Sequence, residues 1–268
     1  MIVSDRTARL VLAIDRLALN LARHWLLYVN VFFGVFVLVP FAAPLLMRIG
    51  ATSLADAIYF VYGFLCHQLP QRSYFLFGPQ ISYSLAEIGS VWQSDDILTL
   101  RQFIGNSAMG WKVAWSDRMV SMYGSLWVGG LLYGLFRKLH PERSRRTRFS
   151  PIAWLLLGIV PMGLDGFSHM INDLVAGISG TGFRDTNAWL QFLTFNLFPA
   201  DFYAGDALGS FNSLARLVTG ALFGLSMIWF IYPFVDDAMQ DLVHQARAKL
   251  ASPRAIALGR LASRSEGQ

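Results

Sequence analysis

Six polar side chains follow one another closely after the apolar run at residues 57–65, in the stretch CHQLPQRS. They are Cys66, His67, Gln68, Gln71, Arg72 and Ser73. A thiol and an imidazole are the groups of a covalent catalyst, an imidazole also binds metals or moves protons, and a guanidinium binds anions. Because Cys66 is the only cysteine, the chain has no internal disulfide and no multi-cysteine metal site.

The position of these residues argues against a catalytic pair of Cys66 and His67. A residue before a proline avoids the helical region, so Cys66 to Gln68 are expected to be the last helical residues before Pro70. Consecutive helix residues point apart, which separates the thiol from the imidazole. The helix C-terminus favours cations there, namely Arg72 and a protonated His67. The alternatives for Cys66 are a lone nucleophile or a buried thiol that only packs.

A second group of polar residues has helical spacing. Asp165, His169 and Asp173 lie at i, i+4 and i+8, so a continuous helix places them on one face. With His67 they offer the ligand types of zinc or another divalent metal, and Asp117 is an alternative to Asp173. The competing interpretation is structural: the carboxylate at position 165 forms a buried ion pair with an arginine from another span, either Arg118 or Arg216.

The composition indicates a membrane protein. Of 268 residues, 54% are apolar and only 15% are charged, whereas a soluble domain has about 25% charged residues. The basic residues stand in blocks beside apolar runs, which is typical of orientation signals and argues against nucleic acid as a partner. The chain lacks a Gly-rich phosphate loop, His-Glu-x-x-His and Gly-x-Ser-x-Gly. The lipid bilayer is therefore the first partner that we expect.

The apolar runs predict an all-α polytopic protein. A membrane-spanning helix needs about 20 mostly apolar residues. A shorter run at residues 54–65 is expected to form a re-entrant or interfacial helix. Two aromatic-rich segments, 75–115 and 172–213, are expected to cap one end, with an interfacial helix at 187–198. Four runs are long enough to span: residues 26–47, 119–136, 151–171 and 214–235.

The basic residues also predict the orientation. Fifteen of the 22 Lys and Arg residues fall in residues 1–24, 137–148 and the tail after residue 235. Loops on the cytoplasmic side are enriched in Lys and Arg, so both termini are expected in the cytoplasm of a prokaryotic cell, with the protein in its inner membrane. The expected division is a cytoplasmic segment (1–24), a membrane domain (25–235) and a basic cytoplasmic tail (236–268). The first segment is either an amphipathic helix on the inner leaflet or an extension of the first span.

This orientation brings polar groups from separate pieces of chain to the outer face. Charges at membrane depth face the interior of a helix bundle and pair with one another, so we expect one shared site. The predicted ligand-binding residues are Cys66, His67, Gln68, Arg72, Ser73, Asp117, Arg118, Asp165, His169 and Arg216. The predicted metal ligands are His67, Asp165, His169 and Asp173.

Four motifs in order, CHQLPQRSYFLFG, SDRMVSMYG, PMGLDGFSH and RLVTGALFG, resemble the family of prokaryotic membrane proteins called domain of unknown function 2085, over roughly residues 60–235. The resemblance implies a helical membrane protein and names no activity. The family's Cys-x-Arg-Cys is replaced here by Ser116-Asp117-Arg118-Met119, and its usual Gln by His169. Its polar signature falls on Cys66, His67, Gln68, Pro70, Arg72, Ser73, Arg118, Tyr123, Asp165, Gly166, Arg216, Thr219 and Gly220.

Three functions remain open from the sequence. In the first, the outward-facing site binds a small polar or anionic ligand, with or without a metal and with or without a reaction; Arg72, Arg118 and Arg216 would hold the anion. In the second, the chain is a non-enzymatic accessory or assembly protein whose charged ring is structural. In the third, it transports an ion or small solute, and its four spans require a homo-oligomer or a larger membrane complex.

Overall fold

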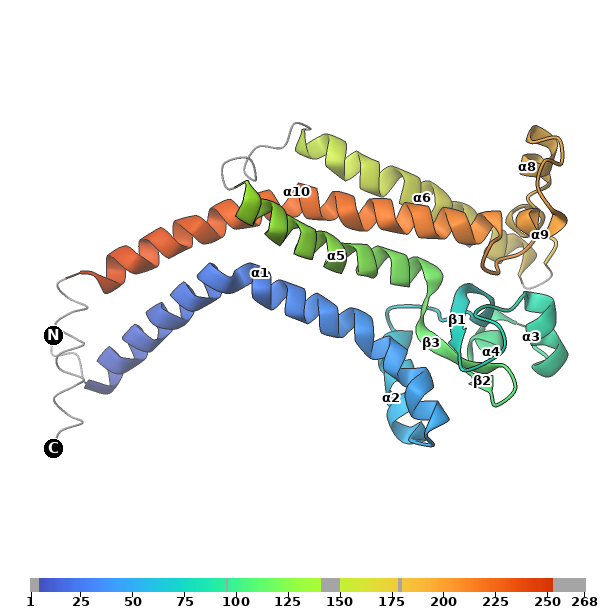
Figure 1. The fold of residues 1–268 in the computed structure, drawn as a ribbon, viewed down its shortest axis with the longest axis horizontal. Coiled ribbons are helices and arrows are strands. Elements are labelled where there is room, and N and C mark those ends of the chain that lie inside the picture. Colours follow the sequence, from blue (N-terminus) through green and yellow to red (C-terminus); the bar gives the residue numbers. More distant parts are fainter. Residues whose placement is uncertain (1–4, 95, 141–149, 178–179, 253–268) are drawn as a thin grey trace.

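The computed structural model describes residues 5–94, 96–140, 150–177 and 180–252. Most of this part is helical, and four of its helices are long and apolar enough to cross a membrane, as the sequence predicts. They are α1 (Asp5–Arg48), α5 (Asp117–Leu139), α6 (Pro151–Ala176) and α10 (Phe211–Leu250), and they form a bundle (Figure 1).

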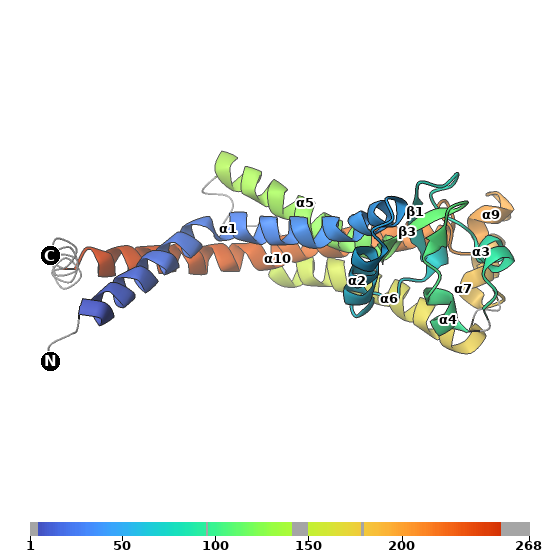
Figure 2. The same ribbon diagram turned by 90° about the horizontal axis from the view of Figure 1, so that it is seen from below.

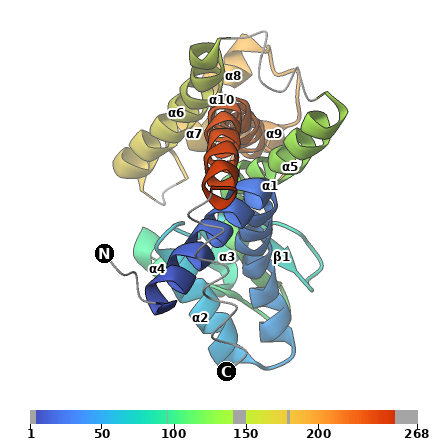
Figure 3. The ribbon, with the colours of Figure 1, turned by 90° about the vertical axis from the view of Figure 1, so that its left-hand side faces the viewer.

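Helix α10 lies in the centre of the bundle, between α6 on one side and α1 and α5 on the other (Figure 3). Glycines allow its backbone to approach α5 closely. A Cβ added at Gly224 would lie 1.9 Å from Ser125 Oγ, and one added at Gly220 would lie 2.8 Å from Ser121 Oγ. The contact between α5 and α10 therefore depends on small residues on both helices.

Helix α1 continues through residue 24 with a break in its geometry. His24 has non-helical dihedral angles (φ −115°, ψ 17°) that divide two helical stretches. The part before His24 diverges from the bundle axis, and α1 and α10 both extend beyond α5 and α6 at this end (Figure 1). The first segment is thus helical and joined to the first span across a kink, which combines features of both sequence interpretations.

The opposite end of the bundle carries a folded cap that contains a small β-sheet. An all-α fold was expected, but β1 (Ser73–Leu76), β3 (Gly110–Ser116) and β2 (Gly105–Asn106) pair antiparallel in the order β1-β3-β2. In Figure 2 the sheet lies beside the short helices of the cap. These short elements are α2 (Thr52–Gly63), η1 (Pro70–Arg72), α3 (Leu85–Val91), α4 (Ile97–Arg101), α7 (Phe183–Thr186), α8 (Ala188–Leu193) and α9 (Ala200–Tyr203).

Aromatic packing joins the cap to the bundle. Trp115 of β3 is fully buried and packs edge-on against Tyr62 of α2 and Phe36 of α1. The Tyr62 hydroxyl donates a hydrogen bond to the carbonyl of Phe36. Strand β3 is thereby held against α1 and α2 immediately before it leads into α5, so the start of α5 is a fixed point.

Candidate functional site

The register of the sheet places the first site residues. Ser73 pairs with Ser116, so the start of β1 lies opposite the end of β3. Arg72 precedes Ser73 and Asp117 follows Ser116, which brings both charges to the start of α5. Arg72 and Asp117, 45 positions apart in the sequence, thus meet through β-pairing, which the helical interpretation of the chain did not include.

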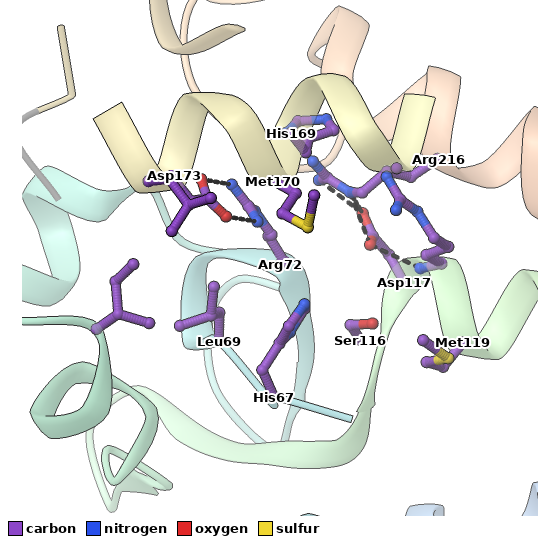
Figure 4. Close-up of a pocket in the computed structure, with 14 residues that line it drawn as sticks. His67, Leu69, Arg72, Ser116, Asp117, Met119, His169, Met170, Asp173 and Arg216 are labelled. Atoms are coloured by element: carbon purple, nitrogen blue, oxygen red, sulfur yellow. Dashed lines mark hydrogen bonds and ion pairs between the residues drawn. The ribbon is translucent and has the colours of Figure 1, made fainter. Parts of the chain in front are cut away.

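A chain of ion pairs crosses the junction between cap and bundle. Arg72 forms two parallel hydrogen bonds to Asp173, at 2.7 and 2.8 Å, and its Nε donates to Asp206 Oδ2 at 2.7 Å. The other oxygen of Asp206 accepts from Arg216 Nη1 at 2.6 Å. Arg216 Nε lies 2.9 Å from both oxygens of Asp117. Figure 4 shows the Arg72–Asp173 and Arg216–Asp117 pairs.

A second cluster surrounds Asp165 on α6. One of its oxygens accepts from Arg118 Nη2 and the other from Arg184 Nη2, both at 2.7 Å. Thr219 also lies 3.3 Å from Asp165 Oδ2. Arg184 Nη2 lies 3.0 Å from His169 Nε2, so the imidazole accepts there and carries its proton on Nδ1. That buried Nδ1 has no hydrogen-bond partner.

Three asparagines hold the loop that supplies Arg184 and Asp206. Asn172 Oδ1 accepts from the Arg184 backbone N–H at 2.8 Å. The amide groups of Asn187 and Asn212 both donate to the Arg184 carbonyl, at 2.7 and 2.5 Å. These side chains are buried, and buried hydrogen bonds of this kind fix the position of a segment whose helices are only a few residues long. The loop is therefore rigid where it delivers its charges.

The ion pairs of the loop stay charged over the ordinary pH range. Burial raises the pKa of Asp206, but the neighbouring Arg72 and Arg216 outweigh it and hold the pKa well below its usual value. Burial likewise lowers the pKa of Arg72, and Asp206 with Asp173 raises it above its usual value. Each partner thus stabilises the ionised form of the other.

The structure does not bring the predicted metal ligands together. Asp165, His169 and Asp173 do face inward from α6, but arginines from other elements take up both carboxylates. Arg184 faces the imidazole of His169, and His67 reaches the lining of the same pocket from the chain between α2 and η1. Within the described residues, no three His, Cys, Asp or Glu side chains are grouped so that they could hold a metal ion.

Cys66, Gln68 and Ser73 stabilise a turn. The expected helix through Gln68 is not formed: α2 ends at Gly63, and Gln68 has a left-handed φ of 51°. Cys66 is buried, and its sulfur accepts from the Gln68 N–H at 3.4 Å. The Gln68 side chain donates to the Tyr59 carbonyl, and the Ser73 hydroxyl to the Leu69 carbonyl. A helix before Pro70 has to end by Gln68 or Leu69, but the proline does not require the helix to continue that far.

A buried lysine reinforces the same turn. Lys112 of β3 is fully buried, and its Nζ donates to the carbonyls of Gln68 and Arg101 at 2.7 and 2.6 Å. Burial lowers the pKa of Lys112 to about 7. Burial and the charge of Arg72 lower the pKa of His67 to about 4, so its imidazole is neutral at pH 7.

A pocket of about 270 Å³ lies between α6, the start of α5 and the turn after α2. Its polar lining includes Arg72, Arg118, Arg216, Asp117 and Asp173, with His67 and His169. Apolar side chains, among them Met119, Met170 and Leu174, form the rest. Figure 4 shows the arginines and aspartates above His67 and Leu69. A second cavity of about 460 Å³ shares Arg72 and Asp173 with this pocket.

Arg118 differs from the other two arginines of the pocket. The side chains of Arg72 and Arg216 each contact two aspartates. Arg118 contacts Asp165 through Nη2, and its side chain is 16% exposed; among the described residues its buried Nε has no hydrogen-bond partner. The absence of a side chain at Gly166 leaves room for it, since a Cβ there would lie 3.2 Å from Arg118 Nη1. Of the three arginines of the pocket, Arg118 is thus the one whose side chain contacts a single aspartate in the described part of the chain.

The sequence analysis missed Arg184 and Asp206. Both lie in the segment interpreted only as an aromatic cap. Arg184 is the only basic residue between positions 172 and 213, and that isolation was a usable signal. Asp206 is one of several acids in the segment, and no pattern distinguished it.

Comparison with known proteins adds one relative. No known family profile matches the chain, and no solved structure matches it. An uncharacterized protein of Methanocaldococcus jannaschii, MJ1492, is 24% identical over 217 residues, which cover 79% of this chain and 92% of that protein. The similarity therefore extends over most of both chains, and the name of this relative carries no activity.

Proposed function

We propose that this chain is a multi-pass protein of a prokaryotic cell membrane with an outward-facing pocket that binds a small anion. Both termini lie in the cytoplasm, as the basic blocks indicate. We also propose membership of the family called domain of unknown function 2085. In support of it, the motif residues Arg72, Arg118, Asp165 and Arg216 meet in the two ion-pair clusters.

The single ion pair of Arg118 carries this proposal. Its guanidinium contacts one aspartate, through Nη2, and its side chain is 16% exposed, so an anion in the pocket has a cation to pair with. A guanidinium binds carboxylate or phosphate through two parallel hydrogen bonds. The pocket is lined by three arginines and two aspartates, with neutral His67 at its edge. Arg72 and Arg216 are compensated by Asp117, Asp173 and Asp206, whereas Arg118 and Arg184 share only Asp165 among the acids that the structure describes, so the positive charge lies on the Arg118 side.

The test is binding of inorganic phosphate to purified protein in mild detergent at constant ionic strength. At 100 times its Kd, a ligand stabilises the folded state by about 2.7 kcal/mol, a rise in Tm of roughly 5–10 °C for a chain of this size. Arg118→Gln should abolish the rise. Arg247→Gln, an exposed arginine far along α10, is the matched control and should keep it. An equal rise in both variants would exclude the pocket as the site.

One observation favours a second function, that of a structural charged ring. Each aspartate in the two clusters is paired with at least one arginine, and the pairs join α5, α6 and α10 to the cap. In that case the chain is an accessory protein whose ion pairs fix the helices. Substitution of Arg216 would then lower stability, and no anion would restore it.

A further inference from the structure

The pocket has an apolar side that a free inorganic ion does not need. Met119 of α5 and Met170 and Leu174 of α6 line it, and both helices are candidate membrane spans. Sites for ligands with a hydrocarbon part combine an apolar wall with a few placed polar groups. Here Met119, Met170 and Leu174 share the lining with the arginines.

The apolar side continues onto the outer surface of α6. Phe167, Met170, Ile171 and Leu174 are spaced i, i+3, i+4 and i+7, which places them on one stripe. All four are exposed, Met170 at 48% and Leu174 at 78%. Because Met170 and Leu174 belong to both the stripe and the pocket lining, the pocket opens onto this face of α6.

The opening lies near the edge of the hydrocarbon core of the bilayer, next to the lipid headgroups. Helix α6 has 26 residues, which is about 39 Å of helix, against about 30 Å for the hydrocarbon core. Roughly three residues therefore extend beyond the core at each end. Residues 174–176 are then outside the core, so the opening between Met170 and Leu174 lies where acyl chains meet headgroups, and Asp173 lies at the edge of the core.

We infer that the ligand of the pocket is an anionic amphiphile, a phosphate or carboxylate group on an alkyl or acyl chain, that enters sideways from the outer leaflet. This inference rests on the proposed function. The headgroup contacts Arg118, and the chain leaves between Met170 and Leu174 along the α6 stripe. An amphiphile confined to the leaflet reaches the pocket at a high effective concentration, which a free ion lacks.

The experiment compares dodecyl phosphate with methyl phosphate, which share a headgroup and differ in the chain. Apparent affinities are measured by native mass spectrometry on the full chain in a neutral alkyl-maltoside detergent. Wild type should bind dodecyl phosphate at least tenfold more tightly than methyl phosphate. Leu174→Gln should reduce that ratio at least threefold. Val175→Gln, exposed at 83% and outside the pocket lining, is the control at the same depth and should match wild type.

The outcomes separate the two proposals. Equal binding of the two phosphates, or a chain preference that Leu174→Gln leaves intact, overturns the amphiphile and keeps the anion pocket. Loss of both ligands in Arg118→Gln, with the chain preference present in wild type, supports both proposals. Failure of methyl phosphate to bind wild type, or equal binding to Arg118→Gln, overturns the proposed function itself and the amphiphile with it.

Discussion

Asp206 is the residue whose neutralisation should damage the fold most. It bridges Arg72 and Arg216 at 2.7 and 2.6 Å, and its side chain is 6% exposed. Asp206→Asn keeps the size of the side chain, but each arginine uses a different oxygen of Asp206, and in the amide one of these oxygens becomes an NH₂ group, which is itself a donor. Two buried arginines then share the remaining carboxylates of Asp173 and Asp117.

The magnitude follows from the cost of a broken buried ion pair. Removing one partner of such a pair costs about 3–5 kcal/mol, because a buried charge loses its counter-charge. For a chain of this size we expect Tm to fall by roughly 6–20 °C. Part of the charge of each arginine remains compensated by its other aspartate, which favours the lower half of that range.

The assay is thermal unfolding of the purified protein in one detergent, with Asp201→Asn as control. Asp201 is an exposed aspartate in the same loop, and its substitution should leave Tm unchanged. Because Arg72 and Arg216 hold the pKa of Asp206 below its usual value, its contribution is complete above the unfolded pKa of about 3.9. The difference between variant and wild type should therefore be the same at pH 5 and pH 8. A Tm within 2 °C of the control would refute the ion-pair reasoning.

Three further predictions follow from other parts of the molecule. Burial lowers the pKa of Lys112 to about 7, so the free energy of unfolding should rise with pH from about 7 towards the unfolded pKa of about 10.4, by up to about 1.4 kcal/mol per pH unit. Lys112→Met should remove this pH dependence in melting curves between pH 7 and 9.5. An unchanged pH dependence in the variant would assign it to another group. Gly224→Ala should lower the free energy of unfolding by about 1–3 kcal/mol through overpacking against Ser125. Gly163→Ala is the control and should leave it unchanged, because an added Cβ there meets no described atom within 4 Å. Equal Tm values for the two variants would contradict close packing of α5 and α10. Cys66 is buried, so a maleimide should label it only after denaturation, and rapid labelling of folded protein would show that the turn is open.

The membrane helices could be predicted from the sequence because length and apolar composition suffice for them. The same physical reasoning identified most of the charged site, since ionised groups beside apolar spans must pair. Arg72, Arg118, Asp165 and Arg216 all lie in the two clusters. The orientation of the four helices in a membrane stays a prediction.

The pairing of the charges could not be predicted, because it depends on the fold of the cap. Strand β3 has almost no alternation between buried and exposed side chains, so it gave no strand signal. The sequence places Asp117 and Arg216 in one shared site, but without β3 it does not predict that the two pair. Helical spacing correctly placed Asp165, His169 and Asp173 on one face of α6. It gives no information about arginines that other elements bring to that face. The interpretation as a metal site assumed that no such arginines were present.

The most direct test of the anion pocket is to locate a heavy oxyanion in it. Crystals of the protein soaked in tungstate should show an anomalous peak within hydrogen-bond distance of the Arg118 guanidinium, between α6 and the start of α5. The same soak of Arg118→Gln should show no peak there. A wild-type pocket without a peak, or a peak that persists in the variant, would contradict the assignment of Arg118 as the anion-binding residue.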